Sequence, residues 1–232
     1  WIEEDLIDII ILGSNAIDME IEKFKELTRG KEILVYPCLY FGRPNWLYGI
    51  NAEMVHALAT NYHFQGADGI YVFNWFAHNY IHRPKRASMF AEQLDWLREI
   101  DDPEAMRGKD KRYVADRGTP SWAYPHGRIH CVLPAKLGTG NEAILTVLVG
   151  EDLAQPPFPK DIEINLELNE LADSDTFEVI LNKHRLLDFE HIETGIRKTL
   201  IPEQLITGYN NVEIYALEGE FVVNGLEINI SY

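Results

Sequence analysis

The sequence has few cysteines and lacks the short motifs that mark several enzyme classes. Only Cys38 and Cys131 are present, and their separation fits neither a metal-ligand spacing nor a disulfide framework. A nucleophile elbow, a phosphate-binding loop, a dinucleotide-binding glycine fingerprint and a zinc motif are also absent from the sequence. These absences argue against several common enzyme classes, and we expect neither a metal nor a cofactor.

Basic residues are scarce relative to acidic ones. Lys and Arg together number 21 against 37 Asp and Glu, which gives a formal net charge of −16. Because binding to a phosphate backbone depends on neutralisation by cationic side chains, nucleic acid is not an expected partner. The sequence also has no apolar run approaching about 18 residues, so it predicts no membrane span.

The first part of the chain repeats one unit, an apolar strand followed by an amphipathic helix. The expected strands are residues 6–12, 32–39 and 70–73, and the expected helices are residues 18–27, 51–64 and 87–100. Asn51 suits the N-cap of the second helix, because its side chain can accept from a free backbone N–H there. Strands that alternate with helices in this way predict a parallel sheet.

The second part of the chain has the pattern of an all-β domain. A polar, charged segment leads into it, and we place the domain boundary near residue 112, which gives domains 1–112 and 113–232. The expected strands are residues 128–133, 143–149, 161–168, 176–181, 211–216 and 226–231. Turn residues such as Gly208 to Asn211 are expected to separate them. The fold class is therefore α/β plus all-β, with an antiparallel β-sandwich or jelly roll in the second part.

The best candidate site follows the second and third strands, where aromatic and polar residues gather. We single out five residues there as candidate ligand contacts: Tyr40, Trp46, Asn74, Trp75 and His78. Loops after parallel strands leave the same edge of a sheet, flat aromatic rings stack on sugar rings, and Asn and His can bind hydroxyl groups. Packing of these aromatic loops on themselves, or beneath the second domain, is an alternative of similar weight.

Two acidic or titratable features are expected to be structural. Asp68 precedes the third strand, so it lies at the edge opposite the loops after the strands. His56 and His63 lie seven residues apart on the second helix, which is too few ligands for a metal site.

Parts of the sequence resemble a known family. The segment Asn61 to Phe76, the segment Leu97 to Glu104 and the β-rich tail are similar to the C-terminal third of the TIM barrel, and its appended β-sandwich, in bacterial glycoside-hydrolase-like proteins. The resemblance implies that the three strands are the sixth, seventh and eighth of a barrel, so that five units would lie upstream of Trp1. It also implies a carbohydrate ligand and favours an extracytoplasmic or secreted location.

The same resemblance leaves the catalytic residues unassigned. Barrel glycosidases generally use two carboxylates, and in many families one of them ends the seventh strand, whereas the corresponding segment here, Tyr36 to Tyr40, contains neither Asp nor Glu. The catalytic carboxylates are therefore expected upstream of residue 1, or the protein is not a conventional hydrolase.

Two further alternatives stay open at this point. An open α/β domain could be completed by a homo-oligomer rather than by missing N-terminal sequence. The β-rich part could also be a non-catalytic carbohydrate-binding or adhesion module that the α/β part supports.

Overall fold

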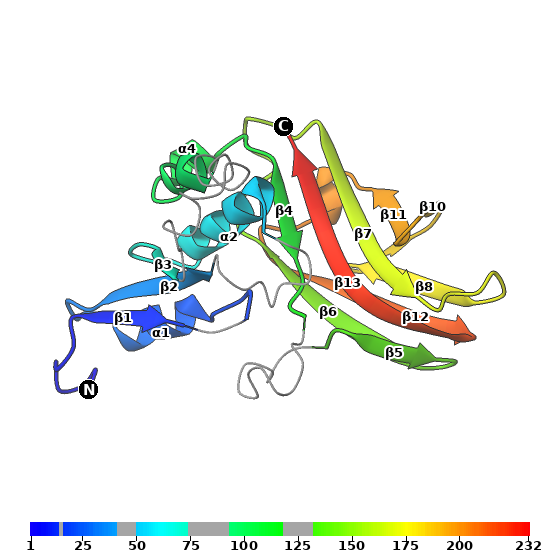
Figure 1. Cartoon of the computed structure of the whole chain (residues 1–232), viewed down its shortest axis with the longest axis horizontal. Coiled ribbons are helices and arrows are strands. Elements are labelled where there is room, and N and C mark those ends of the chain that lie inside the picture. Colours follow the sequence, from blue (N-terminus) through cyan, green and yellow to red (C-terminus); the bar gives the residue numbers. More distant parts are fainter. Residues whose placement is uncertain (14–15, 41–49, 74–92, 118–131) are drawn as a thin grey trace, which may run out of the picture.

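The structure, a computed structural model, describes residues 1–13, 16–40, 50–73, 93–117 and 132–232 (Figure 1). Its first part contains a three-stranded parallel sheet in the order β1 (Ile9–Leu12), β2 (Leu34–Tyr40), β3 (Tyr71–Phe73). Helix α1 (Ile21–Leu27) connects the first two strands, and helix α2 (Ala52–Phe64) lies between the second and third strands in the sequence. The parallel sheet that the strand and helix repeats predicted is confirmed.

One face of the parallel sheet is covered and the other is largely open. Leu12, Val35 and Leu39 from the covered face pack in one core with Ile21 of α1 and Met54 of α2. The opposite face carries large apolar side chains that remain between 38% and 49% exposed, namely Ile9, Ile11, Leu34, Tyr71 and Phe73. Cys38 lies on this face too, but it is buried. Because parallel sheets are normally covered on both faces, most of this face lacks a packing partner among the described residues.

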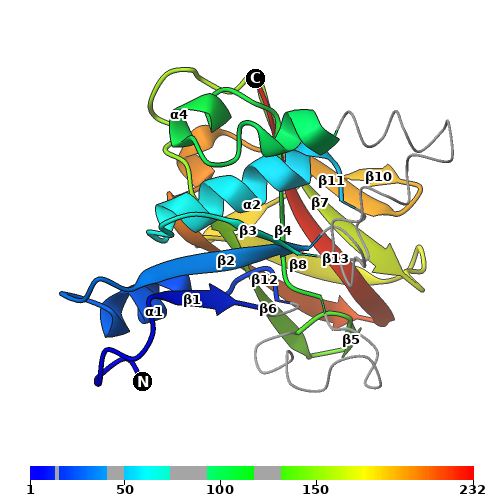
Figure 2. The same ribbon diagram turned by 60° about the vertical axis from the view of Figure 1, so that its left-hand side comes forward.

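Helix α2 is buried on most of its sides because it lies between two cores. Asn51 is its N-cap, as predicted, and its Oδ1 accepts from the Met54 N–H at 3.0 Å. Met54 belongs to the core of the parallel sheet, whereas Ala57 belongs to the core of the β-rich part. Figures 1 and 2 show α2 between the three-stranded sheet and strand β4 (Lys111–Val114).

The β-rich part consists of two antiparallel sheets that share a core. The six-stranded sheet contains β10 (Glu190–Ile192), β11 (Gly195–Thr199), β7 (Asp161–Asn169), β13 (Glu220–Ser231) and β4 in that order, with β5 (Ala135–Gly138) also paired to β13. The four-stranded sheet has the order β6 (Glu142–Val149), β12 (Gly208–Glu218), β8 (Thr176–Leu181), β9 (His184–Leu186). Ile164 of β7 and Val212 of β12 meet in the common core, so the fold is α/β plus all-β as predicted.

The remaining described elements are short. Residues 93–97 are helical and lie within the predicted third helix, and α4 (Pro103–Met106) and the 3-10 helix η2 (Pro202–Gln204) each form a single turn. Within the ranges given above, no helix has the length and apolarity that crossing a membrane requires.

Strand assignments in the β-rich part needed one correction and several additions. The expected turn from Gly208 to Asn211 is instead the beginning of β12, because the buried Asn210 side chain bonds to the backbone of Ile206 and Gly208 and so stabilises extended chain there. Strands β4, β5, β10 and β11 were not predicted, whereas β9 lies within residues 182–187, where the sequence resembles an edge strand. Of the predicted strand 128–133, residues 128–131 lie outside the described residues.

The division into domains 1–112 and 113–232 stays a prediction, and residues 112 and 113 both lie in β4.

Asn61 joins α2 to the end of β6. Its buried side-chain amide donates from Nδ2 to the Leu148 carbonyl at 2.9 Å, and Oδ1 accepts from the Gly150 N–H at 2.8 Å. A Cβ at Gly150 would lie 2.8 Å from Phe64 Cβ and 2.9 Å from Asn61 Oδ1, so glycine permits the close approach of helix and strand.

We expect Asn61→Ala to lower the free energy of unfolding by about 2 to 3 kcal/mol, because it leaves a buried backbone N–H and carbonyl without their partner. Urea unfolding measures the change. Asn141→Ala is the matched control, since Asn141 lies in an exposed turn, and it should change stability by less than about 0.5 kcal/mol. Equal effects of the two substitutions would contradict this role of Asn61.

Candidate functional site

The ends of β2 and β3 meet at one edge of the parallel sheet. Tyr40, the last residue of β2, is the register partner of Phe73, the last residue of β3. The chain therefore enters segments 41–49 and 74–92 from neighbouring points of the same edge. Of the predicted contact residues, Trp46, Asn74, Trp75 and His78 lie outside the described residues, and for Tyr40 only the backbone position is described.

Asp68 lies at the opposite edge and makes structural contacts. Its Oδ2 accepts from the Val35 N–H at 2.7 Å, and its carboxylate pairs with Lys25 Nζ at 2.7 Å. The carboxylate thus links α1, β2 and the turn before β3. A role in chemistry at the strand ends does not fit this position.

The helix histidines are likewise engaged with the backbone. His56 Nδ1 lies 3.3 Å from the Asp110 carbonyl, and His63 Nε2 lies 2.7 Å from the Ile100 carbonyl. Burial lowers the pKa of His56, so its imidazole is neutral at pH 7. No cluster of three or more His, Cys, Asp or Glu with metal-binding geometry occurs among the residues that the structure describes.

A cavity of about 380 Å³ lies where α2, α4, the turn after β6 and the last residue of the chain meet. We call it the junction cavity. Its apolar wall includes Phe64, Met106, Pro156 and Pro157. Its polar wall includes His63, Glu104, Arg107, Lys111, Glu151, Asp152, Gln155 and Tyr232.

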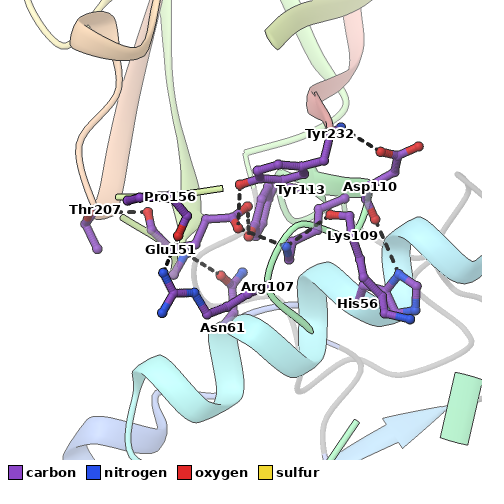
Figure 3. Close-up of polar contacts among 12 residues, drawn as sticks. His56, Asn61, Arg107, Lys109, Asp110, Tyr113, Glu151, Pro156, Thr207 and Tyr232 are labelled. Carbon is purple, nitrogen blue, oxygen red and sulfur yellow. Dashed lines mark hydrogen bonds and ion pairs between the residues drawn. The ribbon is translucent and has the colours of Figure 1, made fainter. Parts of the chain in front are cut away.

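Glu151 is the centre of a polar cluster beside the junction cavity (Figure 3). Its Oε1 accepts from the Tyr113 hydroxyl at 2.8 Å, and its Oε2 accepts from Lys111 Nζ at 2.8 Å and from the Tyr232 hydroxyl at 2.9 Å. The Lys111 ammonium also donates to the Lys109 carbonyl at 3.1 Å and lies 5.1 Å from the centre of the Tyr232 ring. One carboxylate thus links β4, the residue that follows β13 and the turn after β6.

Burial controls the electrostatics of this cluster. The Lys111 side chain has 0% exposure, and burial lowers its pKa although the neighbouring Glu151 carboxylate opposes that change. Burial and the charge of Glu151 raise the pKa of Tyr113 well above its usual value, and the same two causes raise the pKa of Tyr232. Both phenols therefore stay protonated at neutral pH and act as donors to the carboxylate.

A second cavity, of about 230 Å³, lies between the segment after β1 and the β-rich part. Asp18 Oδ2 accepts from the Tyr209 hydroxyl at 2.9 Å, and Asp18 Oδ1 accepts from Gln65 Nε2 at 2.9 Å. Asp116 Oδ1 accepts from the Ile17 N–H at 2.6 Å. These carboxylates are engaged in holding the segment after β1 against β12 and the residues that follow β4.

Sequence reasoning missed the residues of the Glu151 cluster. Lys111 and Tyr113 are an alternating pair in a four-residue strand within a charged segment, and Glu151 and Tyr232 lie far from them in the sequence. No local pattern marks a lysine that is buried by partners from distant strands. Recognition of β4 as a strand of the sheet would have been the one available signal.

Comparison with known proteins yields a partial structural likeness. No family model and no curated protein matches the sequence. Solved structures that match include wild-type BuGH86 in complex with neoagarooctaose, at 13% identity and a TM-score of 0.36, over 52% of this chain and 18% of that chain. Another is a β-porphyranase of glycoside hydrolase family 86 from the human gut bacterium Bacteroides plebeius, at 11% identity and a TM-score of 0.35, over 52% of this chain and 20% of that chain. The chain thus spans a fifth or less of the length of these enzymes.

Proposed function

We propose that the protein is carbohydrate-active and represents the C-terminal portion of a glycoside-hydrolase-like protein. In this proposal β1, β2 and β3 are the sixth, seventh and eighth strands of a (β/α)8 barrel, and the two antiparallel sheets form a jelly-roll-like β-sandwich after it. The carrying observation is the register pairing of Tyr40 with Phe73. Because these two residues end β2 and β3, both aromatic-rich segments begin at the same edge of the sheet. In barrel enzymes this edge binds the substrate.

The open face of the parallel sheet supports the barrel interpretation. Barrel strands turn one face to the surrounding helices and the other to an interior that side chains fill in layers. Here the helix-covered face is buried, while Ile9, Ile11 and Tyr71 on the other face are between 40% and 49% exposed. Five further strands from outside these 232 residues would enclose those side chains.

The proposed site residues have distinct roles. Tyr40, Trp46 and Trp75 supply flat faces for sugar rings, and Asn74 and His78 bind hydroxyl groups. The segment Tyr36 to Tyr40 carries no carboxylate that could act at the strand end. The proposal therefore assigns substrate contacts, and not the catalytic pair, to these residues.

Substitution of Trp75 tests the proposal. We expect Trp75→Ala to weaken oligosaccharide binding at least about tenfold, since loss of one stacking face removes more than about 1.4 kcal/mol. Isothermal titration against a panel of neutral oligosaccharides measures it, with the protein carried in its natural flanking sequence. Trp1→Ala is the control, because Trp1 is 83% exposed and far from the strand ends in the sequence. Unchanged affinity of Trp75→Ala would remove this residue from the site.

One observation favours the alternative of a non-catalytic carbohydrate-binding or adhesion module. The β-rich part has an extensive core of its own, to which α2 contributes only Ala57. Residues 108–232, which keep β4 whole, could be produced alone and checked for folding by circular dichroism. Glycan binding retained by that fragment would favour the module, and binding confined to the longer protein would favour the barrel edge.

A further inference from the structure

We propose that the junction cavity binds a small, neutral, polyhydroxylated molecule of monosaccharide size. This inference goes beyond the proposed function, because the cavity lies at the edge of the parallel sheet opposite the carboxyl ends of β2 and β3. Helix α2 runs back from the strand ends, and its last residues, Thr60, His63 and Phe64, line the cavity. The turn with Asp68 follows α2 at that same edge.

The size and lining of the junction cavity fit a small ligand. Its volume of about 380 Å³ falls within the range of about 300 to 1,000 Å³ that is usual for small-molecule sites. Phe64 lines the cavity and retains 40% exposure, so this aromatic residue is accessible to a ligand. Pro156 and Pro157 extend the apolar wall. Such a wall can pack against the C–H face of a sugar ring.

The charges of the wall disfavour an anion. Lys111 is bonded to Glu151 at 2.8 Å, and Arg107 pairs with Glu104 at 3.4 Å and donates to the Pro156 carbonyl. Both cations therefore already have a carboxylate partner in the protein, and Asp152 adds a further negative charge to the wall. A negatively charged ligand would meet these carboxylates without a free cation to bind it.

Two polar groups of the wall retain hydrogen-bonding capacity. The exposed Gln155 side-chain amide makes no hydrogen bond to any other residue that the structure describes. Asp152 Oδ1 accepts from the Ala154 N–H at 3.0 Å, which leaves Oδ2 as an acceptor. A group of hydroxyls can both donate to Asp152 and pair with either end of the Gln155 amide. Apolar packing combined with both donors and acceptors is the recognition that a neutral polyol requires.

The cavity wall is held in place before any ligand binds. Glu151 accepts three hydrogen bonds, from Tyr113, Lys111 and Tyr232. A Cβ at Gly108 would lie 2.7 Å from Pro157 Cγ, which shows how closely the segment after α4 packs against the proline wall. A wall of fixed shape reduces the entropy that binding costs.

An NMR titration of the 232-residue chain tests this inference, with glucose, galactose and N-acetylglucosamine as neutral probes and glucuronate as the anionic one. We expect saturable binding of a neutral probe and at least about tenfold weaker binding by Phe64→Ala. Gln155→Ala, at an exposed position, should weaken binding in the same direction. Phe158→Ala is the matched control, since Phe158 is 64% exposed and lies outside the cavity, and it should bind as the wild type does.

The outcomes separate this site from the strand-end site. Binding that Phe64→Ala or Gln155→Ala weakens and Trp75→Ala leaves unchanged supports the inference, even if oligosaccharide binding at the strand ends fails. Binding lost only in Trp75→Ala would overturn the inference while supporting the proposed function. Absence of saturable binding, or a preference for glucuronate, would overturn it as well.

Discussion

Glu151→Ala should lower the free energy of unfolding by about 3 to 5 kcal/mol, because removal of one partner leaves the other charge buried without compensation. Lys111 has no exposed side-chain surface, and Glu151 is its only carboxylate partner among the described residues. The same substitution removes the acceptor of the Tyr113 and Tyr232 hydroxyls. Urea unfolding followed by circular dichroism measures the loss.

Two comparisons isolate the cause of that effect. The double substitution Glu151→Leu with Lys111→Met removes both charges, and it should be less destabilised than Glu151→Ala alone. Glu220→Ala breaks the Lys136–Glu220 pair, whose side chains are both more than half exposed, and it should change stability little. If Glu151→Ala were no more harmful than Glu220→Ala, the buried cluster would not stabilise the fold as we describe.

Gly195→Ala is expected to be about as damaging, at about 3 to 5 kcal/mol, because it combines backbone strain with a steric clash. Gly195 begins β11 with φ at +150°, and a Cβ there would lie 2.0 Å from the Leu166 carbonyl oxygen and 2.7 Å from the Leu168 nitrogen. Both contacts are to the backbone of β7, so β11 would have to move away from its neighbour. Unfolding in urea measures the change.

Gly140→Ala is the matched control for this prediction. Gly140 also has a positive φ, of +84°, but a Cβ there would meet no atom within 4 Å. Its substitution should cost only the backbone strain, about 1 to 2 kcal/mol. Equal costs at the two positions would show that the clash with β7 is relieved easily, which would contradict the close pairing of β7 and β11.

Local patterns were sufficient for elements whose reason to form lies within a few residues. Asn51 predicted the start of α2, because an N-cap acts on a backbone N–H three residues away, and the structure shows that bond to Met54. In β7 the alternation of Ile162, Ile164 and Leu166 predicted a strand with one buried face, and all three are buried. The repeated strand and helix units likewise predicted the parallel sheet, because parallel neighbours need a long crossover connection and that connection is usually a helix.

Short strands with polar composition could not be recognised in the same way. Strand β10 contains only Glu190 to Ile192, so its three residues show hardly one period of alternation. It is extended because the neighbouring strand β11 supplies its hydrogen bonds. At Gly208 to Asn211 local turn chemistry pointed the wrong way, because the bonds of Asn210 and the pairing with β6 stabilise a strand there.

The two candidate sites differ in the same way, because one was predicted from local sequence and the other depends on contacts between distant residues. The sequence alone predicted that two aromatic-rich segments each follow a parallel strand. Because parallel strands run in the same direction, both segments were expected to begin at the same edge of the sheet. The junction cavity and the Glu151 cluster required the folded chain, since Lys111, Glu151 and Tyr232 come together only when β4, β6 and β13 are assembled around α2. A buried charge is tolerated only where distant residues provide its partners, and no short stretch of sequence carries that information.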